Sequence, residues 1–182
     1  MISRRKFLGA VPVAVAALSS SPTYATTYFT VASVRQALFP GATNWIDRSL
    51  TLTSQQAKVI SKSASAHMLK TRVSAWDAIG SGGKLGTLVV DQVYGKHEFI
   101  TYAVALGPTG EVHHIEIMDY RETYGDQVRN ANWRAQFNGK RNGQPLVINQ
   151  QVKNISGATL SCVHITDGVR RVLATYALVL AA

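Results

Sequence analysis

Cysteine is nearly absent from this chain of 182 residues: Cys162 stands alone, so no disulfide can form within the chain. The His-x-x-x-His and Cys-x-x-Cys spacings that commonly bind metals are also missing. His113 and His114 are adjacent on an expected strand, so their side chains point to opposite faces and do not suit one shared ion. We therefore expect no metal site and regard Cys162 as a small buried residue.

Motifs of two large enzyme classes are missing as well. The chain has no Gly-x-Gly-x-x-Gly fingerprint, which argues against direct NADH oxidation, and no Gly-x-Ser-x-Gly elbow of a serine hydrolase. Charged residues make up only 16% of the sequence, and the lysines and arginines behind the net charge of +9 are scattered. Because there is no basic stripe, we expect no nucleic-acid binding.

The first 25 residues have the composition of an export signal. Arg4 and Arg5 precede the short apolar run Ala10–Leu18, and small residues up to Ala25 suit a signal peptidase. We expect twin-arginine export, cleavage after Ala25 and a periplasmic protein with one domain at residues 26–182. An uncleaved anchor is the alternative, although the apolar run is short for a spanning helix. Losing the three basic residues of the leader lowers the net charge from +9 to +6.

Three consecutive segments are rich in β-branched and aromatic residues and predict an antiparallel meander: Leu85–Tyr94, His97–Leu106 and Glu111–Tyr120. Helices are predicted at Val31–Leu38, Thr53–Ser63 and Asn132–Phe137. Ser33 and Ser54 are the expected caps of the first two helices. The fold class is therefore α+β, a curved antiparallel sheet flanked by helices.

A longer helix is predicted over Val163–Leu180. Its apolar residues recur at helical spacing: Ile165, Val169, Val172, Leu173, Tyr176 and Leu180. Arg170 and Arg171 are expected elsewhere on the helical wheel. Ser156–Thr159 would form the preceding loop and the first turn, where unpaired N–H groups and the positive dipole end suit a phosphate. From the residues alone, a plain cap and turn is the simpler interpretation.

Several segments, in order along the chain, resemble the FMN-binding domain family. Ser156–Ser161, with the sequence Ser-Gly-Ala-Thr-Leu-Ser, is similar to the flavinylation motif of that family. Tyr120–Asp126 is similar to its Glu-Thr-x-Gly element, and Trp133–Lys140 to its Trp…Phe-x-Gly-Lys element. Leu38–Ala42 is similar to a Phe-Pro-Gly-Ala element near the domain start. The resemblance extends over most of the chain that follows the leader.

The resemblance implies a cofactor and its site. In this family, which includes the periplasmic flavin subunits of the sodium-translocating NADH:quinone reductase and of the Rnf complex, the motif threonine carries FMN through a phosphoester bond. A dedicated flavin transferase that uses FAD attaches it. Carried over, the acceptor is Thr159. The residues expected to bind the cofactor are Thr159, Ser156, Gly157, Ala158, Leu160, Ser161, Glu122, Thr123 and Lys140.

The implied function is an exported flavoprotein that transfers electrons between redox partners through covalent FMN. We expect an electron carrier rather than a self-contained enzyme, with a redox protein or a membrane quinol or haem system as its partner. One residue departs from the family pattern: Lys153 stands where an acidic residue is often found. The alternative is therefore a noncovalent flavin-binding or sensing module. A third hypothesis is an interaction protein that kept the fold and lost the flavin.

Overall fold

The computed structural model describes residues 26–181, and the predicted leader, residues 1–25, lies outside the described residues. The strands are β1 (Thr26–Thr27), β2 (Asn44–Asp47), β3 (Leu50–Thr51), β4 (Arg72–Gly80), β5 (Gly83–Tyr94), β6 (Phe99–Leu106) and β7 (Val112–Tyr120). The helices are α1 (Val31–Leu38), α2 (Ser54–Ala64), α3 (Ala131–Arg134) and α4 (Thr159–Thr175). Short 3-10 turns cover Asp126–Arg129 and Ala135–Phe137, and a π-helical turn, Tyr176–Leu180, continues α4.

The strands form one antiparallel sheet in the order β1-β7-β6-β5-β4-β2, with β3 paired to β4 as well. The predicted meander is confirmed as β5, β6 and β7, whereas β4 was not predicted. Register shifts interrupt the pairing of β4 with β5 and of β6 with β7, and such irregularities bend a sheet. The predicted α+β class, with a curved antiparallel sheet, is confirmed.

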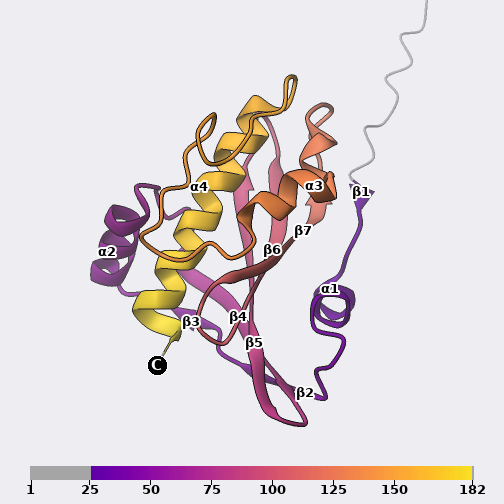
Figure 1. The fold of residues 1–182 in the computed structure, drawn as a ribbon. Coiled ribbons are helices and arrows are strands. Elements are labelled where there is room, and N and C mark those ends of the chain that lie inside the picture. Colours follow the sequence, from indigo (N-terminus) through magenta and orange to yellow (C-terminus); the bar gives the residue numbers. More distant parts are fainter. Residues whose placement is uncertain (1–25, 182) are drawn as a thin grey trace, which may run out of the picture.

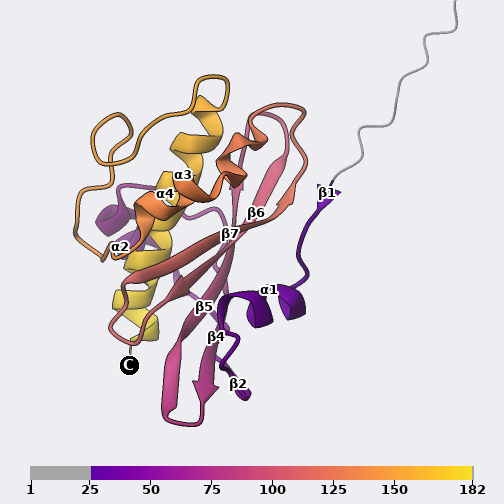
Figure 2. The same cartoon turned by 45° about the vertical axis from the view of Figure 1, so that its right-hand side comes forward.

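Helices cover both faces of the sheet (Figures 1 and 2). Helix α4 lies along one face with α2 packed beside it, and α1 lies against the other face. Alternating residues of the central strands therefore enter two separate cores. Val104 of β6 belongs to the large core under α4, and its neighbours Ala103 and Ala105 belong to the smaller core under α1.

The two predicted N-terminal helices are present, but their caps differ from the prediction. Thr30 caps α1 and Thr53 caps α2, each in a capping box that includes the residue three positions later. The assignment of Ser33 and Ser54 as caps is wrong. A cap precedes the first helical residue and accepts an N–H from the first turn. Ser33 lies inside α1, where its N–H donates to the Thr30 hydroxyl and its own hydroxyl accepts the Thr30 N–H.

Helix α4 begins at Thr159, so Ser156 and Gly157 form the preceding turn, as predicted. All six apolar residues predicted to form its buried face are buried. The prediction that both arginines lie away from this face is wrong for Arg171, which is only 4% exposed. The Arg171 guanidinium is buried because it binds Asp91 of β5, while Arg170 stays partly exposed beside Asp167.

Candidate functional site

A cavity of about 620 Å³ opens at the N-terminal end of α4. Figure 1 shows this end of the helix at the top of the molecule. Three segments line it: the turn between β5 and β6, the loop after β7, and the first turn of α4. The lining residues are Lys96, His97, Glu122, Thr123, Tyr124, Gly157, Ala158, Thr159, Leu160 and Ser161. Its volume lies within the range of about 300–1,000 Å³ that small-molecule sites occupy.

The first turn of α4 presents its N–H groups without a side-chain cap, since Ala158 at the cap position supplies no hydrogen bond. Gly157 has a φ of +85°, and a Cβ there would meet nothing within 4 Å, so the space above it is open. Ala158 is buried, whereas Thr159 is exposed at the mouth of the cavity. An uncapped helix start next to open space is an arrangement that suits a phosphate group.

The Thr159 hydroxyl has a defined partner. The side-chain amide of Asn154 donates a hydrogen bond to the Thr159 Oγ1 oxygen at 3.0 Å. This bond occupies one lone pair of that oxygen and leaves the hydroxyl proton free for another partner. The hydroxyl is therefore both accessible and held in place.

Glu122 joins the loop after β7 to the turn between β5 and β6. Its carboxylate accepts the backbone N–H groups of Lys96, of His97 at 2.6 Å and of Glu98 at 3.0 Å. Burial raises the pKa of Glu122, but these three N–H groups outweigh burial and the pKa lies below its usual value. Gly95 permits the contact, because a Cβ there would collide with the Glu122 carboxylate. Glu122 thus holds the cavity wall together.

A second contact fixes the other side of this loop. The Tyr120 hydroxyl donates to the carbonyl of Tyr124 at 2.6 Å and lies 3.0 Å from the hydroxyl of Ser161. Since the single Tyr120 proton goes to the carbonyl, Ser161 is the donor in the second bond. Burial raises the pKa of Tyr120, so this phenol stays protonated. The Tyr124 ring itself is 83% exposed at the cavity edge.

The structure brings together most of the predicted cofactor-binding residues. Seven of them line the cavity, from Glu122 and Thr123 on one side to Gly157–Ser161 on the other. Ser156 is exposed in the same turn but is not part of the lining. Ser161 is buried and bonded to Tyr120, which fits a structural tie better than an alternative acceptor.

Lys140 lies away from the cavity, so the structure does not bring this predicted residue to the site. Its carbonyl accepts the N–H of Val112, at the start of β7, whereas the cavity lies beyond Tyr120 at the end of that strand. The nine residues of β7 separate the two by about 25 Å. The reason is that the segment after β7 runs back along the strand before it reaches Lys140.

Sequence reasoning missed Lys96, His97, Tyr124 and Asn154. Lys96 and His97 could have been predicted from the order of the strands in the meander. In an antiparallel meander, successive strands run in opposite directions. The turn between the first two strands therefore lies at the same end of the sheet as the last residue of the third strand. The observed register, in which Ile100 faces Tyr120, brings residues 95–98 next to Glu122 for this reason. No local pattern marked Asn154 or Tyr124.

Trp133 and Phe137 belong to the core rather than to the cavity. Both are buried, and their rings meet edge to face with centroids 5.3 Å apart. The Trp133 indole donates to the carbonyl of Lys153 at 2.8 Å, and the side chain of Gln136 accepts the Lys153 N–H at 2.8 Å. Trp133 and Gln136 therefore hold the backbone of Lys153, just before Asn154, in place.

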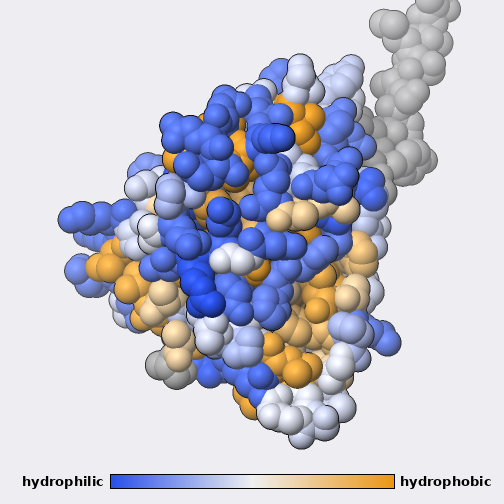
Figure 3. All heavy atoms as spheres, in the orientation of Figure 1, coloured by the Kyte–Doolittle hydropathy of each residue, from blue (hydrophilic) through white to orange (hydrophobic). Residues whose placement is uncertain are grey.

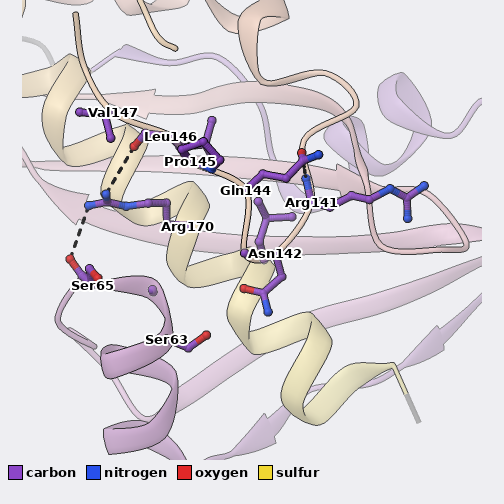
Figure 4. A pocket seen from close by; sticks show the side chains of 12 residues that line it. Ser63, Ser65, Arg141, Asn142, Gln144, Pro145, Leu146, Val147 and Arg170 are labelled. Atoms are coloured by element: carbon purple, nitrogen blue, oxygen red, sulfur yellow. Dashed lines mark hydrogen bonds between the residues drawn. The ribbon is translucent and has the colours of Figure 1, made fainter. Parts of the chain in front are cut away.

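A second cavity, of about 180 Å³, lies beside the middle of α4, between the end of α2 and residues 141–147 (Figure 4). There Arg170 donates to the carbonyls of Ser65 and Leu146, and the backbone of Arg141 donates to the side chain of Gln144. None of the predicted site residues lines it. The face that carries these loops is largely hydrophilic, with apolar residues towards the lower right (Figure 3).

Within residues 26–181, no helix is both long enough and apolar enough to cross a membrane. Over the same range, no group of three or more histidine, cysteine, aspartate or glutamate side chains is arranged to hold a metal ion.

Together, the α+β fold and the uncapped helix start over an open cavity define a domain suited to a phosphate-bearing cofactor. Residues 95–174 match the family model described as "FMN-binding domain", which confirms the predicted resemblance. These residues are similar to that family, and the match supports FMN as the ligand. The matched range includes every segment that lines the cavity.

No curated protein matches the chain at a significant level. Among solved structures, the crystal structure of Shewanella oneidensis NqrC is similar at a TM-score of 0.47 and 16% sequence identity, over 78% of this chain and 70% of that one.

Proposed function

We propose that this protein is an exported electron carrier whose FMN is joined to Thr159 by a phosphoester bond. The observation that carries the proposal is the exposed Thr159 hydroxyl at the uncapped start of α4, over a cavity of about 620 Å³ inside an FMN-binding domain. When bound, FMN supplies one- and two-electron transfer through its isoalloxazine ring. The protein residues would hold and orient this group.

The residues present fit such a cofactor. The N–H groups of the first turn of α4 would bind the phosphate, with Gly157 allowing close approach. Leu160 and Tyr124, which are exposed at the cavity edge, offer apolar surface to a planar ring. Lys96 and His97 add basic groups on the opposite wall. Glu122 is held on this wall by three backbone N–H groups that bind its Oε1 oxygen and partly offset its negative charge.

The proposal also assigns a maturation route. A flavin transferase outside the cytoplasm would attach the cofactor after residues 1–25 direct twin-arginine export. The donor and acceptor of electrons would be a redox protein or a membrane quinol or haem system. Noncovalent binding is the second candidate function, because Lys153 replaces the acidic residue that often precedes the motif.

Intact-protein mass after denaturation tests the proposal on protein produced together with a flavin transferase. We expect the wild type to gain the mass of one FMN ester and Thr159→Ala to gain none. Ser81→Ala is the control, because it removes an exposed hydroxyl outside the motif and outside the cavity lining. A wild type that keeps its unmodified mass and loses its yellow colour on denaturation would support the noncovalent alternative. A colourless, unmodified wild type would refute both.

A further inference from the structure

Asn154 is the only described side chain shown to bond the hydroxyl of Thr159. The contact spans five residues and joins an extended segment to the start of α4. Asn154 itself is half-buried, whereas Thr159 is exposed. The side-chain amide therefore approaches the hydroxyl from the protein side and leaves its solvent side open.

The backbone next to Asn154 is held at both of its polar groups. Lys153 donates its N–H to Gln136 and accepts the Trp133 indole N–H at its carbonyl, each at 2.8 Å. Trp133 is buried in the main core, so the clamp is fixed to the body of the domain. Asn154 is consequently a rigid support for the Thr159 hydroxyl rather than a side chain on a free loop.

Such a support matters for a threonine at this position. Threonine in a helix divides between two χ1 rotamers, and these point its hydroxyl in different directions. A hydrogen bond from Asn154 favours the rotamer that places the oxygen at the cavity mouth. Because the amide is a donor, the second lone pair of the oxygen and its proton remain available.

The same side chain carries a cost for folding. The Asn154 Oδ1 oxygen is buried and has no hydrogen-bond partner among the described residues. A buried acceptor without a partner destabilises the folded state, and an apolar residue of similar shape avoids that loss. The Asn154 amide is therefore poorly explained by stability alone.

We propose that Asn154 is the positioning residue for attachment of FMN, holding the Thr159 hydroxyl in the reactive orientation. This inference rests on the proposed function. In the attachment step, Thr159 Oγ1 forms a bond to the phosphorus of the FMN half of FAD and the anhydride P–O bond breaks. AMP leaves, and the hydroxyl proton passes to a base of the transferase. Asn154 touches neither phosphate and acts through the hydroxyl.

The test compares the rate of attachment in full-length wild type, Asn154→Leu and the control Asn138→Leu, which replaces an exposed asparagine beyond Trp133. Purified transferase and saturating FAD are used, with intact mass as the readout. We expect Asn154→Leu to lower the maximal rate about three- to tenfold, the value of one lost hydrogen bond, with the KM for FAD unchanged. Asn138→Leu should keep the wild-type rate. The loss in Asn154→Leu should increase in a Thr159→Ser background, because serine is freer to rotate.

Two measurements on unmodified protein separate positioning from folding. The thermal midpoint of Asn154→Leu should equal or exceed that of the wild type. The side-chain amide resonances of Asn154 should move in Thr159→Val, which lacks the acceptor. Equal attachment rates in wild type and Asn154→Leu, or a lowered midpoint that accounts for the slower rate, would overturn the inference. A wild type that takes no FMN at all would instead refute the proposed function, and this inference with it.

Discussion

The start and the middle of α4 differ in how their polar groups are satisfied. In the middle, the buried Arg171 guanidinium binds Asp91 at 2.6 Å and also the carbonyls of His67 and Gln92, each at 3.0 Å. At the start, the first turn has no side-chain cap, and the nearby Asn154 Oδ1 is buried without a partner among residues 26–181. One helix thus joins a fully paired Arg171 guanidinium to an uncapped end.

This difference separates the polar groups that stabilise the fold, in the middle of the helix, from the unpaired polar groups at its start that can bind a ligand. Buried polar groups are normally paired, and where they are not the native state loses free energy. Arg171, in the middle of α4, follows this rule through partners on β5 and the α2–β4 connection, whereas the Nε atom of the neighbouring Arg170 is buried without a partner among residues 26–181. The start departs from it at the uncapped first turn and at Asn154 Oδ1, next to the Thr159 hydroxyl at the cavity. A bound phosphate would complete the bonding of the uncapped N–H groups.

The largest expected effect is on stability and comes from the middle of the helix. Arg171→Ala should lower the free energy of unfolding by about 3 kcal/mol, because it leaves Asp91 without its cationic partner beside the buried Tyr102 hydroxyl. Urea unfolding followed by circular dichroism measures the change. FMN attachment to the folded fraction should stay at the wild-type level.

A double variant is the control for this prediction. Arg171→Met with Asp91→Leu replaces both charges with apolar groups and should recover at least half of the lost stability, since no charge remains buried and unpaired. A loss below about 1 kcal/mol in Arg171→Ala, the range of exposed ion pairs, would contradict the view that the middle of α4 is the stabilising region.

Glu122 provides a smaller, pH-dependent test at the cavity. Its pKa in the folded state lies below the usual value, so its contribution is fully present above about pH 4.3, the unfolded value, and is lost as the pH falls through the folded pKa. Glu122→Gln should cost about 1 kcal/mol at pH 7 and progressively less below pH 4.3, because glutamine keeps one acceptor but not the charge. Thermal unfolding at a series of pH values measures this, with the exposed Glu98→Gln as control. A constant difference at all pH values would exclude the carboxylate as its cause.

The sheet shows which parts of the fold can be predicted from the sequence. The β5–β7 meander was predictable because its strands consist largely of β-branched and aromatic residues. Strand β4 was missed because Asp77 interrupts its apolar pattern. That carboxylate is buried and paired with Arg48, between β2 and β3, and with Lys84 and Thr87 on the neighbouring strand β5. These pairings exist only once the strands are placed side by side, so the apolar pattern of the segment alone does not indicate them.

The candidate site follows the same division. Thr159 and Glu122 were found because each lies in a contiguous sequence motif, and both line the same cavity. Lys140 was carried over with its motif, but the chain between Trp133 and Lys140 runs away from the cavity. Arg171 was misassigned because helical periodicity indicates on which side of the helix a side chain lies, but not which residue of the sheet it will pair with. Its burial depends on Asp91, eighty residues earlier.

Tyr124 sharpens the comparison because its ring contributes almost nothing to the fold. It is 83% exposed, so Tyr124→Ala should change the free energy of unfolding by less than about 0.5 kcal/mol. The affinity for FMN should fall about two- to tenfold in a Thr159→Ala background, where binding is noncovalent, because an aromatic contact with the ring is lost. Fluorescence titration with FMN measures the affinity. An unchanged affinity would remove Tyr124 from the ligand site, and Tyr28→Ala, at a tyrosine outside the cavity lining, is the control.

Cys162 lies where the two regions of α4 meet, and labelling its thiol tests that boundary without any substitution. Thr159 and Leu160 are exposed, whereas Ser161 and Cys162 are buried. Burial raises the pKa of the Cys162 thiol, and the thiolate is the form that reacts with alkylating reagents. At pH 8, labelling of the folded protein should therefore be at least about a thousandfold slower than in guanidinium chloride. Since Cys162 is the only cysteine, total label measures this site without a background. Labelling that is faster than global unfolding allows would mean that the first turn of α4 opens on its own, and the boundary between the ligand-binding end and the stabilising middle would then lie deeper in the helix.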